Sequence, residues 1–188
     1  MSRHRITGAA RVAGIAGNPV AHSLSPVIHN AWLAAGEIDG AYVPFAPADA
    51  AGFAALVATG RAGLIMGLNV TAPFKQQAFA LADEATTAAR LTGSANILQF
   101  IDGRVLADSS DGVGLMRGLK EQAPTLDLRG RSVVVLGAGG AAQGPLVVLA
   151  DVQDGRIGGD LVHIDGLEGA HGFSVATRPD VPGRPRRP

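Results

Sequence analysis

The sequence predicts an α/β protein, in which an N-terminal three-layer αβα domain with a mainly parallel sheet is followed by the beginning of a second α/β unit. Two observations support this class. Apolar segments of strand length alternate with helical segments through residues 12–77, which is typical of parallel βαβ units joined by right-handed crossovers. A further apolar segment runs into a glycine-rich turn at residues 137–142, where a second unit would begin.

Three short apolar segments are the expected parallel strands of the first domain. Each is bounded by turn or cap residues, as buried strands usually are. They lie at residues 12–16, 42–45 and 64–70. Two further strands are expected at residues 95–101 and 104–107, because Asp102 and Gly103 between them form the best hairpin signal in the chain.

Capping residues indicate where the helices begin. A side-chain oxygen at the N-cap accepts a hydrogen bond from the first helical turn, and proline is tolerated just inside that turn. The expected N-caps are Ser25 before Pro26, Asp49, Thr71 with Pro73 in the first turn, and Asp111. The first two helices would end at Gly36 and about Thr59, residues 78–91 would be helical with a break at Asp83 and Glu84, and the last helix would cover residues 113–121.

Composition excludes several classes of function. The 188 residues are 47% apolar and 17% charged, and 16 basic residues balance 16 acidic ones, which predicts neither a nucleic-acid nor an anionic-membrane partner. The absence of cysteine excludes disulfides and thiolate chemistry, and the five histidines are not at metal-ligand spacings, so no metal site is expected. The chain shows no apolar run of about 18 residues and no signal-peptide core, so a cytoplasmic location is expected.

Polar side chains gather where the expected strands end. Ser23 and Ser25 follow the first strand, and Asn69, Thr71 and Lys75 lie at and after the end of the third. Ligands of open α/β sheets bind outside the carboxyl ends of the strands, so these side chains could meet around one ligand. Each also has a purely structural interpretation, because a lone lysine is usually a solvated surface charge and hydroxyl residues often cap helices or close turns.

The motif Asn69-Val70-Thr71-Ala72-Pro73-Phe74-Lys75 resembles the N-V-T-x-P-x-K signature of the shikimate dehydrogenase family. Three further elements are similar to family motifs and occur in the family's order: Ser23-Leu24-Ser25-Pro26, Gly93-Ser94-Ala95-Asn96 and Asp111-Gly112-Val113-Gly114. The last departs from the family pattern N-T-D-G-x-G, since Ser109 and Ser110 replace its Asn and Thr. The resemblance covers about residues 10–144.

The resemblance implies a shikimate 5-dehydrogenase, which reversibly reduces 3-dehydroshikimate to shikimate with NADPH in chorismate and aromatic amino-acid biosynthesis. Hydride addition to a ketone places negative charge on its oxygen, so the site needs a proton donor there. By resemblance, Lys75 is the acid/base group and Asp111 is the catalytic carboxylate beside it. The substrate-binding residues that the resemblance implies are Ser23, Ser25, Asn69, Thr71, Lys75, Asn96 and Asp111.

The strand expected at residues 132–136 leads into a G-x-G-x-x-A turn, which is typical of a Rossmann-type NAD(P)-binding domain. The backbone amides expected to hold the pyrophosphate of NADP are those of Gly137, Ala138, Gly139, Gly140 and Ala141. Beyond Gly144 the resemblance ends, because no N-R-T element for the 2′-phosphate follows, and a premature end or a frame change is expected there. If residues 161–164 instead form a second strand, Asp165 would bind the ribose and the cofactor would be NAD.

The expected units are a shikimate-binding catalytic domain at residues 1–110, a partial Rossmann domain at 111–165 and a Pro/Arg-rich, disordered tail at 166–188. Three alternatives stay open. They are a catalytically inactive substrate-binding fragment of the family, an NAD-dependent quinate/shikimate dehydrogenase, and a generic α/β nucleotide-binding module that would leave the serine and Asn69 motifs unexplained. The expected partner is a small-molecule substrate, and homodimerisation is left open.

Overall fold

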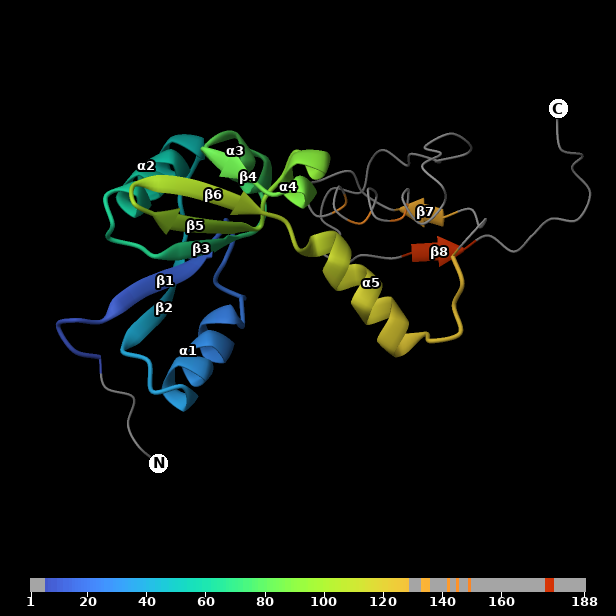
Figure 1. Ribbon diagram of the computed structural model, residues 1–188, viewed down its shortest axis with the longest axis horizontal. Helices are drawn as coiled ribbons and strands as arrows, with labels where there is room; N and C mark the ends of the chain where they lie inside the picture. Colours follow the sequence, from blue (N-terminus) through green and yellow to red (C-terminus); the bar gives the residue numbers. More distant parts are fainter. Residues whose placement is uncertain are drawn as a thin grey trace, which may run out of the picture.

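The computed structural model describes residues 6–128, 133–135 and 175–177, together with residues 142, 145 and 149. The strands of its main sheet are β1 (Arg11–Ala16), β2 (Gly40–Phe45), β3 (Gly67–Val70), β4 (Glu84–Ala85), β5 (Ile97–Ile101) and β6 (Arg104–Asp108). They form a six-stranded sheet in the order β2-β1-β3-β5-β6-β4 (Figure 1). Three of its pairings are parallel and two are antiparallel, so the expected mainly parallel α/β sheet is confirmed.

The strand register brings four chain segments to one edge of the sheet, namely the edge formed by the carboxyl ends of β1 and β3. Ala16, the last residue of β1, pairs with Val70, the last residue of β3, so the two strands end at the same level. The antiparallel strand β5 begins at this level, with Ile97 opposite Asn69. Ile97 also lies opposite Asp108, the last residue of β6. The residues that follow β1, β3 and β6 and those that precede β5 therefore meet at this edge.

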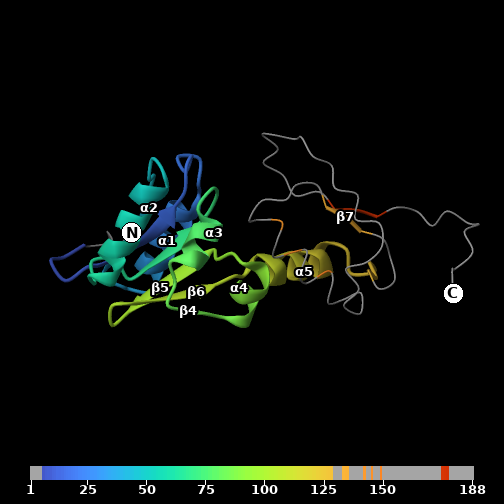
Figure 2. The same ribbon diagram turned by 90° about the horizontal axis from the view of Figure 1, so that it is seen from above.

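Helices lie on both faces of the sheet. They are α1 (Ser25–Ala35), α2 (Ala50–Arg61), α3 (Lys75–Ala80), α4 (Thr87–Thr92) and α5 (Asp111–Gln122). Phe53 of α2 and Ala78 of α3 belong to the main core together with Leu98 of β5. On the opposite face, Leu33 of α1 packs against a smaller cluster that contains Tyr42 of β2. The helix α5 leads away from the sheet in both views (Figure 1, Figure 2). None of these helices is long and apolar enough to cross a membrane.

The face of the sheet that carries α1 is only partly covered by the described part of the chain. No residue of α1 is buried, and its Val27 and Trp32 are 70% and 63% exposed. Beside α1 lies a cavity of about 480 Å³, whose lining includes the apolar side chains of Ile38 and Met66 and the polar side chain of Asn69. The apolar residues of α1 therefore border an open groove rather than a closed core.

Only one of the four expected N-caps is confirmed. Asp49 precedes α2 with extended backbone angles, and its Oδ1 accepts the N–H of Gly52 at 2.8 Å. The expectations for Ser25, Thr71 and Asp111 are wrong, because the N-cap residues of α1, α3 and α5 are Leu24, Phe74 and Ser110. Those three residues have right-handed helical backbone angles, whereas a capping side chain requires an extended backbone to reach the first turn.

The third strand and the helix after it are both shorter than expected. Residues 64–66, expected in the strand, precede β3. After β3 the chain makes a turn in which the N–H of Phe74 donates to the carbonyl of Thr71 at 3.1 Å, and the Ala72–Pro73 peptide within that turn is cis. Thr71 itself continues the sheet, since its N–H donates to the carbonyl of Ala16 at 2.9 Å. The helix therefore begins only at Lys75.

The segment at residues 78–91 is broken at Asp83 and Glu84, as expected, but a short strand lies within the break. The helix α3 ends at Ala80, and the short strand β4 pairs in parallel with β6 before α4 begins. Asp83 holds the chain at this change of direction, because its carboxylate accepts hydrogen bonds from Arg61 at 2.6 and 3.1 Å and from the N–H of Val105 at 2.7 Å. These tertiary contacts prevail over the helix propensity of the alanine-rich sequence.

The second unit is described only in part. Val133–Val135 form β7 inside the strand expected at residues 132–136, and β7 pairs in an antiparallel manner with β8 (Val175–Thr177). The strand β8 lies within the tail expected to be disordered, so these three residues depart from that expectation. Residues 137–141 and 161–165 lie outside the described residues, as do the pyrophosphate turn and the ribose-binding Asp165 predicted there.

Gly60 tests how closely α2 packs on the sheet. A Cβ atom at this position would lie 2.4 Å from two ring atoms of Phe100, which is 5% exposed. Gly60→Ala should therefore destabilise the domain by about 1–3 kcal/mol through overpacking, although helix propensity alone favours alanine by about 1 kcal/mol. Thermal melting shows whether Gly60→Ala lowers or raises the stability of the domain. Gly52→Ala in the same helix would meet nothing closer than 3.5 Å and serves as the matched control, which should not destabilise; a G60A protein as stable as G52A would contradict the close packing.

Asp83 should make stability depend on pH. The hydrogen bonds from Arg61 and then from the N–H of Val105 lower the pKa of its carboxyl. The stabilisation is therefore complete above the unfolded-state pKa of about 4 and is lost as the pH falls through the lower folded-state pKa. Asp83→Asn should lower Tm at neutral pH. The difference in Tm between the variant and the unchanged protein should shrink as the pH falls below the unfolded-state pKa. Melting curves recorded across that range would contradict this if the difference stayed constant.

Candidate functional site

The most closely connected polar group at the sheet edge consists of Lys75, Asp111 and Asn96, which we call the Lys75 cluster. Lys75 Nζ donates to Asp111 Oδ2 at 2.6 Å, and Asn96 Nδ2 donates to Asp111 Oδ1 at 2.9 Å. The side chains of Lys75 and Asp111 are only 12% and 21% exposed. Partial exclusion of water strengthens such charge-assisted hydrogen bonds relative to the same pair on an open surface.

Three different elements position the Lys75 cluster. Lys75 is the first residue of α3, Asp111 is the first residue of α5, and Asn96 directly precedes β5. The backbone connects these starting points, because the N–H of Ala95 donates to the carbonyl of Lys75 at 2.9 Å and the N–H of Asn96 donates to the carbonyl of Asp108 at 3.0 Å. The cluster is therefore held by the ends of regular elements, which limits the freedom of all three side chains.

Ser110 completes the surroundings of Asn96. The N–H of Ser110 donates to Asn96 Oδ1, and Ser110 Oγ accepts from Asn96 Nδ2, each at 3.0 Å. Both amide hydrogens of Asn96 are thus used, one by Ser110 and one by Asp111. Ser109 is buried, and its N–H donates to the carboxylate of Asp108 at 2.7 Å. Of the two serines that replace Asn and Thr of the family pattern, Ser110 therefore fixes Asn96, which in turn contacts Asp111, whereas Ser109 contacts Asp108.

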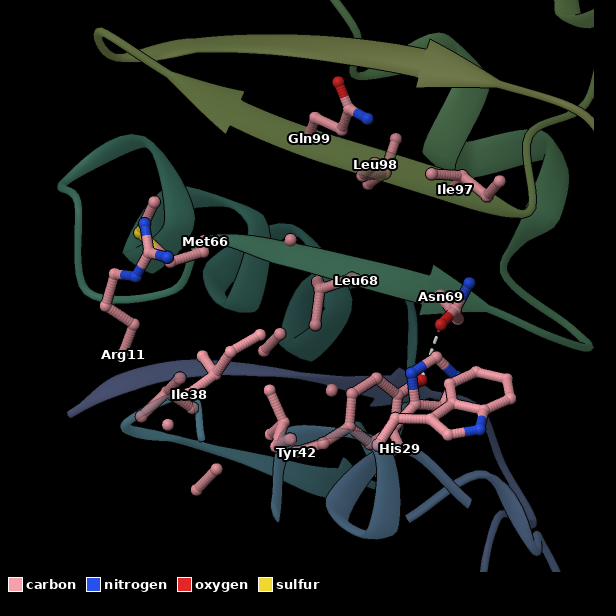
Figure 3. A pocket seen from close by; sticks show the side chains of 18 residues that line it. Arg11, His29, Ile38, Tyr42, Met66, Leu68, Asn69, Ile97, Leu98 and Gln99 are labelled. Atoms are coloured by element: carbon pink, nitrogen blue, oxygen red, sulfur yellow. Dashed lines mark hydrogen bonds between the residues drawn. The ribbon is translucent and has the colours of Figure 1, made fainter. Parts of the chain in front are cut away.

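Asn69 is held by a residue that sequence reasoning missed. Tyr42 Oη donates to Asn69 Oδ1 at 2.6 Å (Figure 3). Desolvation by burial raises the pKa of Tyr42 to about 12, so its hydroxyl stays a neutral donor at physiological pH. The signal that could have found it is strand register. Tyr42 pairs with Ala13 of β1 and Asn69 pairs with Ile15, and residues two apart on a strand share one face of the sheet.

The three predicted hydroxyl residues lie on the segments that follow β1 and β3. Ser23 Oγ accepts the N–H of Ser25 at 3.2 Å at the start of α1. The two segments adjoin, because the N–H of Asn18 donates to the carbonyl of Ala72, next to Thr71, at 3.1 Å. Within the part of the chain that the structure describes, no hydrogen bond connects these hydroxyls to the Lys75 cluster. They form a second polar group at the same edge.

The arrangement is suited to moving one proton at a fixed position. The ammonium of Lys75 can donate a proton to an oxygen that gains negative charge, and the resulting amine can take it back in the reverse direction. Asp111 aligns the ammonium through one oxygen while Asn96 holds the other. The amides proposed to hold a dinucleotide, Gly137 to Ala141, lie outside the described residues, so this geometry concerns the substrate side alone.

Sequence and fold are similar to those of known dehydrogenases. Residues 15–98 match the family described as the shikimate dehydrogenase substrate binding domain. The chain is 54% identical over 145 residues to shikimate dehydrogenase (NADP(+)) of Caulobacter vibrioides. The aligned region covers 77% of this chain and 50% of that relative. The crystal structure of shikimate dehydrogenase from Aquifex aeolicus matches with a TM-score of 0.73 at 30% identity over 79% of this chain and 55% of that one. Shikimate 5-dehydrogenase from Listeria monocytogenes, in complex with shikimate and NAD, matches with a TM-score of 0.69 at 34% identity over 79% and 50% of the two chains.

The matched region contains most of the predicted substrate residues. Residues 15–98 include the two serines, Asn69, Thr71, Lys75 and Asn96, whereas Asp111 lies beyond the match. The chain spans about half the length of the curated relatives that it matches. The family match therefore concerns the substrate side of these enzymes.

Asn96 should contribute more to the stability of the site than Ser110. Asn96→Ala deprives both Asp111 Oδ1 and the N–H of Ser110 of a partner, and should cost about 1–2 kcal/mol. Ser110→Ala removes one neutral acceptor and keeps the backbone N–H, so it should cost less than about 1 kcal/mol. Thermal melting of the two variants compares them, and a larger loss for Ser110→Ala would contradict the shared role of Asn96.

Proposed function

We propose that the chain belongs to the shikimate dehydrogenase family, on the match of residues 15–98, and that it binds shikimate and 3-dehydroshikimate and takes part in their interconversion. The observation that carries the proposal is the pair formed by Lys75 and Asp111, 2.6 Å apart and mostly screened from water. A lysine with no task beyond solubility extends into solvent. Here the ammonium is held beside the sheet edge where α/β proteins bind their ligands.

The proposed chemistry is a proton transfer coupled to hydride transfer. NADPH, when bound, would supply the hydride to the carbonyl carbon of 3-dehydroshikimate. The electron pair of the carbonyl bond moves to the oxygen, and Lys75 Nζ donates a proton to that oxygen to give the 3-hydroxyl of shikimate. In the oxidative direction the amine of Lys75 accepts the hydroxyl proton. Asp111 keeps the ammonium aligned, and Asn96 fixes Asp111 from the other side.

The remaining predicted residues are proposed to hold the acid. The hydroxyls of Ser23, Ser25 and Thr71 donate to no partner within the described residues, so they are available to the carboxylate and hydroxyls of the ligand. The two serines lie at the start of α1, where the positive end of the helix dipole favours an anion. Asn69 adds an amide on the neighbouring strand.

The cofactor side of the proposal rests on the relatives. The curated relatives are named for NADP(+), whereas the Listeria structure was solved with NAD. We propose NADP, with the backbone amides of residues 137–141 holding its pyrophosphate. The proposed units are the substrate domain at residues 1–110, a Rossmann-type unit at 111–165 and a tail at 166–188. A cytoplasmic location is part of the same proposal, and homodimerisation stays a prediction.

A second candidate function is substrate binding without turnover. It is favoured by one observation, namely that the predicted substrate-binding residues all lie within the described residues 6–128, whereas the residues predicted to hold the dinucleotide lie outside them. In this case the Lys75 cluster would bind the ligand and perform no chemistry. A quinate/shikimate dehydrogenase that uses NAD is distinguished from both by assays with quinate as the substrate and NAD as the cofactor.

Lys75→Ala is the decisive variant for turnover. It should lower NADP reduction with saturating shikimate by about 100- to 10,000-fold, the usual contribution of a general acid/base group, while shikimate affinity measured by calorimetry changes less. The matched control is Lys120→Ala, which removes the other lysine of the chain, an exposed residue of α5, and should change neither quantity.

The unchanged protein decides between the two candidate functions. NADP reduction that is lost in Lys75→Ala supports the dehydrogenase. Shikimate binding without reduction of NADP or NAD supports the second candidate. Absence of both binding and turnover would refute the proposed function. Equal turnover in the unchanged protein and Lys75→Ala would remove Lys75 from the mechanism.

A further inference from the structure

The amide of Asn69 is oriented by its contact with Tyr42. Its Oδ1 accepts the hydroxyl hydrogen of Tyr42 at 2.6 Å (Figure 3). Within the described residues, Tyr42 Oη has no other acceptor and Asn69 Nδ2 has no partner. A reversed amide would donate from Nδ2 to Tyr42 Oη and would leave the hydroxyl hydrogen of Tyr42 without an acceptor among the described residues. Because a phenol hydroxyl donates better than it accepts, the pair favours the orientation in which Oδ1 faces Tyr42. The end that remains is Nδ2, which can only donate.

Tyr42 is itself fixed at its ring and at its backbone. It is 6% exposed, and its ring stacks on that of His29 with centroids 4.1 Å apart and planes 8° apart. Asn30 brackets the backbone of Tyr42, because Asn30 Nδ2 donates to its carbonyl at 2.8 Å and its N–H donates to Asn30 Oδ1 at 3.0 Å. Both His29 and Asn30 belong to α1. The hydroxyl of Tyr42 is therefore a rigid reference point for Asn69.

We propose that Tyr42 is a positioning residue for substrate binding, which orients the amide of Asn69 so that Nδ2 donates to the ligand; this inference rests on the proposed shikimate-binding function. A carboxylate ligand accepts hydrogen bonds and donates none. An Asn69 free to reverse its amide would present Oδ1 for part of the time, and two acceptors facing each other repel. The Tyr42 hydroxyl disfavours that unproductive orientation, because it donates to Oδ1 better than it would accept from Nδ2. Tyr42 acts through Asn69 and does not itself touch the reacting atoms.

The variant Tyr42→Phe isolates the hydroxyl, because phenylalanine keeps the ring that stacks on His29. Calorimetry with shikimate and the full-length chain should show an affinity about three- to tenfold weaker, the effect expected for one net hydrogen bond. Asn69→Ala should weaken binding at least as much, since it removes the donor itself. Asn69→Asp should weaken it most, because the aspartate still accepts from Tyr42 and presents its second oxygen to the ligand carboxylate.

The double variant Tyr42→Phe/Asn69→Ala separates positioning from a structural role. If Tyr42 acts through Asn69, then Tyr42→Phe should have no further effect once Asn69 is alanine. The same loss of affinity in both backgrounds would overturn the proposal, because Tyr42 would then act on the ligand directly or through the fold. Unchanged affinity in Tyr42→Phe alone would also overturn it.

A measurement without ligand distinguishes this inference from the proposed function. The side-chain amide signals of Asn69 in an NMR spectrum are identified by their loss in Asn69→Ala, and they should shift or broaden in Tyr42→Phe. Unchanged signals would refute the positioning role whatever the ligand. If the signals respond but the unchanged protein binds no shikimate, the proposed function fails and the proposed role toward a shikimate carboxylate falls with it.

Discussion

The candidate site depends on one constraint, the antiparallel placement of β5 between β3 and β6. Because β5 runs against β3, its first residues lie where β1 and β3 end. A parallel β5 would carry Asn96 to the other edge of the sheet, a displacement on the order of 16 Å for a five-residue strand. The hairpin at Asp102 and Gly103, which both have positive φ angles, then returns β6 to the first edge and delivers Asp111 to Lys75.

The sequence predicted those parts of the fold that local chemistry controls. Asp102-Gly103 is recognisable because its residues favour the positive φ angles of a tight hairpin turn, and Asp49 is a cap because its backbone is extended. Ser25, Thr71 and Asp111 carry the same kind of side chain, but capping depends on backbone angles that neighbours in space determine. The strand β4 depends on the contact of Asp83 with Arg61, 22 residues away, which no local pattern contains. The sequence therefore predicts which residues can form turns and caps, but it does not predict which residues contact each other across the fold.

The site shows the same division between residue type and geometry. Resemblance to a family supplied Lys75, Asp111 and Asn96, and the structure adds that they form one hydrogen-bonded group. The replacements at Ser109 and Ser110 are compatible with it, because the contacts they make use backbone N–H groups and one hydroxyl, which serine shares with threonine. Tyr42 lies 27 residues before Asn69 on a strand that is not its neighbour, so only the complete sheet order reveals it.

The balance of donors and acceptors indicates what kind of molecule the site suits. Both oxygens of Asp111 and both amide hydrogens of Asn96 are used internally. Lys75 Nζ has three hydrogens and gives one to Asp111, so two remain. Asn69 Nδ2 and the serine and threonine hydroxyls are further donors. The free hydrogens of Lys75 and Asn69 suit a ligand that carries a carboxylate and a carbonyl oxygen, while the hydroxyls of serine and threonine can either donate to it or accept from it. Under the proposed function, the carbonyl oxygen of the ketone would accept from the ammonium of Lys75, which would also protonate it.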